Sequence, residues 1–311
     1  MTAGWVAGSV RATAMARRRL GAVAARELAT CPGLPAALEV LARSPYGRDV
    51  GPADTLASAE RAVEATTLWN LRVLAGWLPA EGAGLFRLLA GWFEIANIDE
   101  HLSGFAADPL EAGVPPFRLG SLATAWPRLS RTSSPAELRA ALAASAWGDP
   151  GADTHRAIST WLRISWATRV SADIEPARPW AAGAVALLVA RELVATGNPR
   201  PGVGTAAVIG RLLGAGWSGA TGLADLARRL PVSARWALDE VTDPSDLWLA
   251  EIRWWARLRR DGTALALHPA FGRRRPLGAA VVLAADAWLV TAALELAARG
   301  GADREVWDAL A

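Results

Sequence analysis

Five polar side chains lie close together in the segment GWFEIANIDEHLSG, residues 91–104, which otherwise consists mainly of aliphatic and aromatic residues. They are Glu94, Asn97, Asp99, Glu100 and His101. Carboxylates and imidazoles are common zinc ligands and common groups of acid-base catalysis. The segment is therefore either a metal or acid-base site, or the polar end of a helix.

Helical geometry opposes the metal interpretation. Asp99, Glu100 and His101 are consecutive, so on a helix they point ~100° apart and do not converge on one ion. Glu94 and His101 share a face but lie two turns apart, ~10 Å. We therefore predict no metal or catalytic site here. We expect a partly solvated helix end, with Gly104 as its left-handed cap and His101 near the negative end of the helix dipole.

Other chemical motifs are missing from the sequence. The chain contains no lysine, so it has neither a Walker lysine nor a Schiff-base lysine. It also lacks the Gly-x-Ser-x-Gly motif of a nucleophile elbow. His155 follows Asp153 and Thr154, which predicts the first turn of a helix, and His268 precedes a proline, which predicts a loop. We expect no cofactor.

Charge and cysteine content narrow the classes further. The 33 basic residues exceed the 30 acidic ones by only three, and the arginine clusters at residues 17–19 and 273–275 are short and far apart. We therefore expect no nucleic-acid partner. Trp254 and Trp255 lie beside several arginines and could stack on bases, but the preferred interpretation is that one ring is buried and arginine stems lie across the other. The single cysteine, Cys31, excludes an intramolecular disulfide and fits a reducing cytoplasm.

The most apolar segment is residues 278–298. Asp286 lies inside it, and a central aspartate opposes membrane insertion by about 3 kcal/mol. We predict a buried helix and no transmembrane helix. We also expect no signal peptide, because arginines at residues 17–19 interrupt the N-terminal region.

Helix-forming residues dominate the chain and the breaks fall at glycine and proline clusters, which predicts an all-α fold. Three short helical patterns recur, LPAALEVLARSPYGRDV from residue 34, SPAELRAALAASAWGDPG from residue 134 and TGLADLARRLPVSARW from residue 221. Each has an aromatic residue near its end, at Tyr46, Trp147 and Trp236. The recurrence indicates an internal repeat.

A long apolar helix that ends at glycine follows each of these patterns. The three glycines are Gly104, Gly197 and Gly300. We therefore predict three homologous helical units, at residues 1–107, 108–199 and 200–311. Alignment on the glycines places Leu187 and Val290 opposite Glu94, and Ala190 and Ala293 opposite Asn97, so that only the first unit carries the polar residues.

Three stretches together resemble a known family. They are FEIANIDEHLSG with Glu94, Asn97 and Ile98, the arginine-rich VRATAMARRRL near the N-terminus, and the C-terminal PLGAAVVLAADAWLVTAALELAARGGADREVWDAL. Over essentially its whole length the chain resembles the central-stalk subunit of V-type and A-type rotary ATPases, a family with prokaryotic and eukaryotic members.

The resemblance implies a funnel with pseudo-threefold symmetry and no catalytic activity of its own. Such a subunit lies peripherally on the cytoplasmic face of the cell membrane. It joins the axle subunits of the central stalk to the membrane-embedded proteolipid ring and transmits torque for ATP-coupled ion transport. Two alternatives remain, a helical-repeat scaffold for another partner and an all-α enzyme with an unrecognised site.

The segment FGRRRPLG, residues 271–278, is the candidate partner contact. Its glycines and Pro276 predict that Arg273, Arg274 and Arg275 project from a loop before the third long helix. Such arginines would meet acidic groups on the axle, the cytoplasmic loops of the ring or anionic lipid headgroups. The alternative is a solvated turn without a partner.

Overall fold

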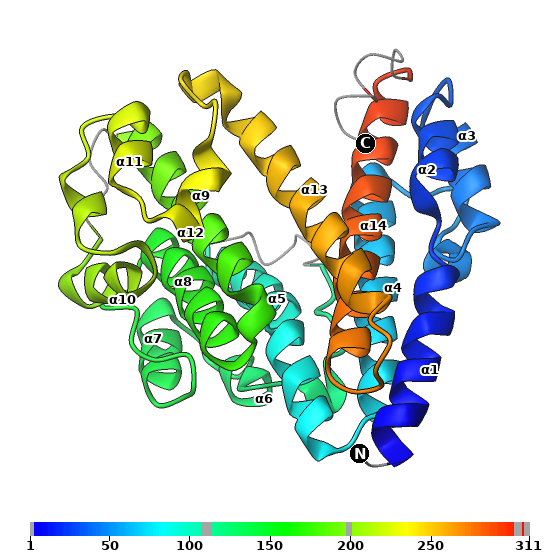
Figure 1. Ribbon diagram of the computed structural model, residues 1–311, viewed down its shortest axis with the longest axis horizontal. Coiled ribbons are helices and arrows are strands. Elements are labelled where there is room, and N and C mark those ends of the chain that lie inside the picture. Colours follow the sequence, from blue (N-terminus) through cyan, green and yellow to red (C-terminus); the bar gives the residue numbers. More distant parts are fainter. Residues whose placement is uncertain (1–2, 107–113, 197–200, 302–306, 308–311) are drawn as a thin grey trace. The chain divides into compact units, whose positions relative to one another are not determined.

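The computed structural model describes all residues except 1–2, 107–113, 197–200, 302–306 and 308–311 (Figure 1). Within the described residues the regular structure is entirely helical, with fourteen α-helices and six short 3-10 helices and no strand. The all-α prediction is confirmed. Two of the predicted long helices are α5 and α14, which contain 25 residues each.

The chain forms two compact units, residues 1–84 with 255–311 (unit 1) and residues 85–254 (unit 2). The three units predicted from the sequence were defined by an internal repeat and not by compactness, so that division stays a prediction. The elements of unit 1 are α1 (Ala3–Arg17), α2 (Gly21–Ala29), α3 (Leu34–Ala42), η1 (Gly47–Asp49), α4 (Leu56–Trp77), the start of α5 (Ala80–Gly104), the end of α13 (Leu247–Ala266) and α14 (Arg274–Ala298).

Helix α14 is the central helix of unit 1. It packs against α1, α2, α3 and α4, and most of its side chains are buried. Leu28 from α2, Leu41 from α3 and Val63 from α4 share one core cluster with Val290 and Leu294 of α14. Full burial of each such side chain contributes about 1.5–3 kcal/mol, so an almost wholly apolar helix is expected at this position.

Unit 2 contains the remainder of the chain. Its elements are the rest of α5, η2 (Gly120–Leu122), α6 (Trp126–Leu129), α7 (Pro135–Ala143), α8 (His155–Asp173), η3 (Glu175–Ala177), α9 (Arg178–Thr196), α10 (Val203–Leu213), η4 (Gly216–Gly219), α11 (Leu223–Arg229), α12 (Val232–Arg235), η5 (Trp236–Leu238), η6 (Pro244–Asp246) and the start of α13. One core cluster joins α5 to α6, α7 and α8, and another surrounds α9.

Several helices begin where side-chain caps predict. Thr154 accepts a hydrogen bond from the backbone N–H of Ala157 at the start of α8, and His155 is the exposed first residue of that helix, as predicted. Ser134 caps α7 in the same way. His268 lies outside helix, again as predicted.

The three glycines expected to close the long helices differ from one another. Gly300 follows α14 with φ of +101°, so the left-handed cap is confirmed there. At Gly104 the prediction is wrong, because this residue is the last of α5 and is not among the glycines with positive φ. Gly197 lies outside the described residues.

Two stretches, Glu175–Thr196 and Arg274–Ala298, are long and apolar enough to cross a membrane. In the second, 78% of the most apolar window is buried within the protein, which agrees with the buried helix predicted around Asp286. Length and composition alone do not distinguish a core helix from a membrane span, so these two helices are weak evidence for insertion.

Candidate functional site

The polar segment of α5 contains a buried carboxylate. Glu94 accepts hydrogen bonds from the backbone N–H groups of Thr124 at 2.5 Å and Ala125 at 2.7 Å, just before α6. The indole Nε1–H of Trp147, which follows α7, donates to the same carboxylate at 2.8 Å. Glu94 is fully buried. Both oxygens are thus held by the protein itself, so this group is arranged to fix α6 and α7 against α5.

Asn97 lies one turn later and is also buried. Its amide nitrogen donates to the carbonyl of Phe117 at 3.0 Å, and its amide oxygen accepts from the N–H of Phe117 at 2.6 Å. Together Glu94 and Asn97 form hydrogen bonds with backbone groups of the segment that follows α5. The partly solvated helix end predicted for these two residues is therefore wrong, because burial had no local signature in the sequence.

Two other polar residues of the segment, Asp99 and His101, bind different partners. Asp99 pairs with Arg163 at 2.8 Å, and the His101 ring contacts the backbone and hydroxyl oxygens of Thr132, each at 3.1 Å. Among the described residues, no three His, Cys, Asp or Glu side chains are grouped so that they could hold a metal. Asp99 and His101 thus bind segments other than those held by Glu94 and Asn97.

A second buried carboxylate, Asp286 of α14, has an equivalent environment in unit 1. It accepts from the backbone N–H groups of Leu20 at 2.9 Å and Gly21 at 2.8 Å, at the start of α2. The hydroxyl of Tyr46, which follows α3, donates to it at 2.9 Å. Burial, then the charge and hydrogen bond of Asp286, raise the pKa of Tyr46 well above its ordinary value.

The aromatic partners of the two carboxylates are themselves held alike. The Ser44 hydroxyl donates to the carbonyl of Leu41 and accepts from the N–H of Tyr46. Ser145 makes the same two bonds, to Leu142 and from Trp147. The recurring Ser-x-aromatic spacing therefore has one local structure in both units.

Asp286, rather than Val290, is the residue that corresponds to Glu94. Alignment on the closing glycines placed Val290 opposite Glu94, but Asp286 lies one helical turn earlier and makes the equivalent hydrogen bonds. Part of this offset arises because Gly104 is the last residue of α5, whereas Gly300 lies beyond the end of α14 at Ala298. The signal that could have found this residue was an aspartate in an otherwise apolar helix.

The third aromatic of the repeat, Trp236, has a different neighbour. It lies against α9 at Gly183, where an added Cβ would be 2.6 Å from the indole ring. Its Nε1–H donates to the carbonyl of Ser233 at 2.8 Å. A close glycine contact stands here in place of a buried carboxylate.

The predicted loop is wrong for two of the three arginines of residues 273–275. Arg274 and Arg275 form the first turn of α14, whereas Arg273 lies just before the helix at its N-cap position and makes no side-chain capping hydrogen bond. Pro276 is tolerated there because the N–H groups of a first turn have no intrahelical partner. Arg273 pairs with Glu81, and Arg275 donates to the carbonyl of Pro269 at 3.0 Å. Arg273 and Arg274 remain exposed.

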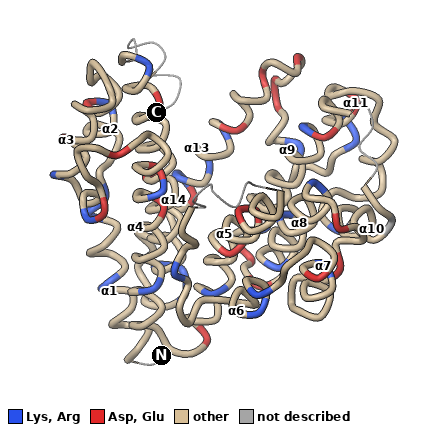
Figure 2. The backbone as a smooth tube through the Cα atoms, turned by 180° about the vertical axis from the view of Figure 1, so that it is seen from behind, with Lys and Arg blue, Asp and Glu red and all other residues tan. Residues whose placement is uncertain are grey.

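Trp254 and Trp255 are both half-buried. Trp254 donates to the carbonyl of Trp180 at 3.0 Å, and Trp255 stacks on Trp288 with ring centroids 5.4 Å apart. Their rings thus take part in packing inside the two units. Figure 2 shows basic and acidic residues interspersed along the helices.

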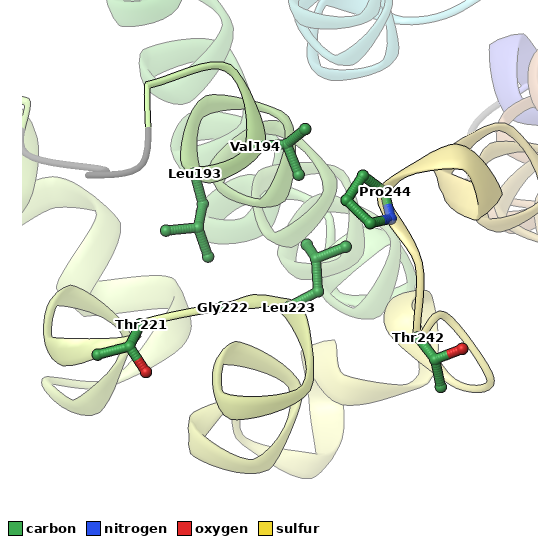
Figure 3. Close-up of a pocket in the computed structure, with 7 residues that line it drawn as sticks. All are labelled: Leu193, Val194, Thr221, Gly222, Leu223, Thr242 and Pro244. Carbon is green, nitrogen blue, oxygen red and sulfur yellow. The ribbon is translucent and has the colours of Figure 1, made fainter.

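One surface pocket of about 300 Å³ lies in unit 2 beside the end of α9 (Figure 3). Its lining residues are Leu193, Val194, Thr221, Gly222, Leu223, Thr242 and Pro244. These residues are apolar or carry hydroxyl groups, and none of the seven is titratable. The pocket therefore offers surface for packing rather than groups for acid-base chemistry.

The chain matches no protein-family model and no curated protein sequence. Functional inference therefore rests on the two buried carboxylates, the repeated elements around them and the exposed surfaces.

Proposed function

We propose that the chain is the central-stalk subunit of a V-type or A-type rotary ATPase, which links the rotating axle to the membrane-embedded proteolipid ring. The observation that carries the proposal is the equivalence of the Glu94 and Asp286 networks. In each, a carboxylate of a long helix accepts from two successive backbone N–H groups and from an aromatic side chain. Such equivalence supports duplication of one helical unit.

The order of elements supports a third copy. Three pairs of long helices occur along the chain, α4 with α5, α8 with α9 and α13 with α14, and short helices precede each pair. An aromatic residue of the repeat lies before each pair, at Tyr46, Trp147 and Trp236. This order agrees with the proposed units of residues 1–107, 108–199 and 200–311.

The long helices pack on short helices in a cyclic order along the chain. Helix α5 packs on the short helices α6 and α7, α9 packs on α11 and α12, and α14 packs on α2 and α3. Each long helix thus covers the short helices of the next proposed unit, and the last covers those of the first. We infer the pseudo-threefold funnel from this order. A body built of packed helices suits a part that must transmit torque without bending.

In this function the protein makes and breaks no bond. It lies on the cytoplasmic face of the membrane as a peripheral component of the complex and moves with the ring during ATP-coupled ion transport.

The experiment is purification of the tagged chain from detergent-solubilised native membranes. We expect the nucleotide-binding, axle and ring subunits to co-purify with it in fixed stoichiometry, and to be lost together when the tag is placed on a destabilised Glu94→Ala variant. Recovery of the wild-type chain alone would contradict the proposal, and recovery with a defined set of unrelated proteins would favour the scaffold alternative.

A further inference from the structure

Three segments of unit 1 meet at one end of that unit. They are the first half of α1, the turn between α4 and α5, and the loop between α13 and α14 (Figure 1). A Cβ added at Gly8 would lie 2.4 Å from Leu78 of the α4–α5 turn. The N–H of Gly272 donates to the Ser9 hydroxyl at 3.4 Å. The ion pair between Glu81 and Arg273 joins the remaining two segments.

These segments expose large apolar side chains, which we call the aromatic end of unit 1. Its residues are Val10, Trp77, Leu267 and Phe271, which are 57%, 51%, 76% and 37% exposed. Single exposed apolar residues are ordinary on protein surfaces. Here four of them lie on three segments that contact one another, so this end is the place to look for a docking surface.

The charge at the aromatic end is positive. It contains three arginines, Arg273, Arg274 and Arg275, and the carboxylate of Glu81, which pairs with Arg273. Arg275 donates to the carbonyls of His268 and Pro269, which carry no charge. Its guanidinium group also lies 4.9 Å from the ring centroid of Phe271. Arg275 thus holds the loop that carries Phe271, and the end keeps an excess of positive charge.

We propose that the aromatic end of unit 1 docks on the surface of an anionic lipid bilayer. Trp and Phe side chains prefer the headgroup region, where an apolar ring and a polar edge are both satisfied. Arg274 is exposed and placed to pair with a lipid phosphate, since a guanidinium group holds a phosphate bidentately.

The inference deepens the proposed function by naming which part of the chain meets the membrane. The inference rests on that function for the location of the protein at a membrane. The exposed residues and charges that support it do not depend on that function. Binding of the purified chain to pure lipid vesicles can therefore test the inference separately from the proposed stalk function.

The test is co-sedimentation of the purified full chain with vesicles of equal parts phosphatidylcholine and phosphatidylglycerol. We expect binding that weakens as salt is raised, and little binding to pure phosphatidylcholine. The combined variant Trp77→Ser, Leu267→Ser and Phe271→Ser should bind at least about tenfold more weakly. Arg274→Gln should weaken binding and reduce its salt dependence.

The matched control replaces exposed apolar residues elsewhere, with Val23→Ser, Val232→Ser and Trp248→Ser, whose side chains are also exposed. Circular dichroism and thermal unfolding verify that all variants are folded. Equal loss of binding in the control variant, or no preference of the wild-type chain for anionic vesicles, would overturn the inference. Co-purification with the ring despite absent vesicle binding would leave the stalk function standing and assign the aromatic end to a protein contact.

Discussion

Glu94 in unit 2 and Asp286 in unit 1 hold equivalent neighbours with side chains of different length. The longer glutamate is paired with Trp147, whose N–H lies on the flank of its ring. The shorter aspartate is paired with Tyr46, whose hydroxyl lies at the tip of its side chain. In both units the acid and the aromatic together span the gap between the long helix and the short ones.

The comparison shows that the two sites share a set of hydrogen-bond donors around a buried carboxylate. The identities of the acid and of its aromatic donor differ between them. Two backbone N–H groups and one aromatic donor satisfy a carboxylate that would otherwise be costly to bury. At Gly183 and Trp236 the carboxylate is replaced by close packing. The three locations can therefore be compared by mutation.

Removal of either carboxylate should have the largest effect. Glu94→Ala leaves three donors without their acceptor and should lower the free energy of unfolding by about 3–5 kcal/mol, since each orphaned buried donor costs ~1–3 kcal/mol. Asp286→Ala should cost a similar amount. Urea denaturation monitored by circular dichroism measures both. Glu100→Ala, at a half-buried position of the same helix, is the control. A loss below that of Glu100→Ala in either unit would break the equivalence.

An added methyl group at Gly183 should have the next effect. Its Cβ would meet the Trp236 ring at 2.6 Å, and such overpacking costs about 1–3 kcal/mol. Gly210→Ala in α10 is the matched control, because nothing lies within 4 Å of that Cβ. Combining Gly183→Ala with Trp236→Leu should recover most of the loss, as thermal unfolding of the four proteins would show. Equal stability of the two alanine variants would mean that close packing is not what fixes Trp236.

The smallest effect is expected at Tyr46, the only tyrosine of the chain. An unfolded tyrosine ionises near pH 10, about its unperturbed pKa, whereas the folded pKa is raised. Above about pH 10 the unfolded chain therefore loses a proton that the native chain retains, and stability falls as pH rises. Tyr46→Phe should cost ~1 kcal/mol at neutral pH and flatten this alkaline dependence.

Tyrosinate absorbance provides the measurement for Tyr46, because a single group contributes to it. The native chain should show no ionisation near pH 10, and the same chain in concentrated urea should show it. Ionisation of native Tyr46 at its ordinary pKa would mean that its hydroxyl is not buried against Asp286.

Local patterns were enough to predict the helices, the cap at Thr154, the left-handed Gly300 and the burial of α14. They were insufficient for the carboxylate networks, because Asp286 meets partners 240 and more positions away in the chain. Periodicity carries no information about which distant donor a buried acid will meet. The recurring aromatics Tyr46 and Trp147 were visible in the sequence, but alignment on the closing glycines placed Val290, one turn after Asp286, opposite Glu94.

The start of α14 shows a second limit of sequence patterns. Glycines and a proline around residues 273–275 favour a loop by local rules, yet the proline occupies a first turn where its missing N–H has no cost. The distinction depends on where the helix begins, and the sequence around residue 273 does not fix that position. Exposure of Arg273 and Arg274 was correctly predicted, although Arg274 lies in the helix and not in a loop.

The rotary-stalk function is tested most directly by ATP-driven charging of native membrane vesicles, followed with a voltage-sensitive dye that responds to transport of either H⁺ or Na⁺. Vesicles from cells that lack this chain should hydrolyse ATP without building a membrane potential, and addition of the purified chain should restore the potential. If the vesicles charge equally well without the chain, or stay uncharged after the folded chain is added, the chain does not couple the axle to the ring.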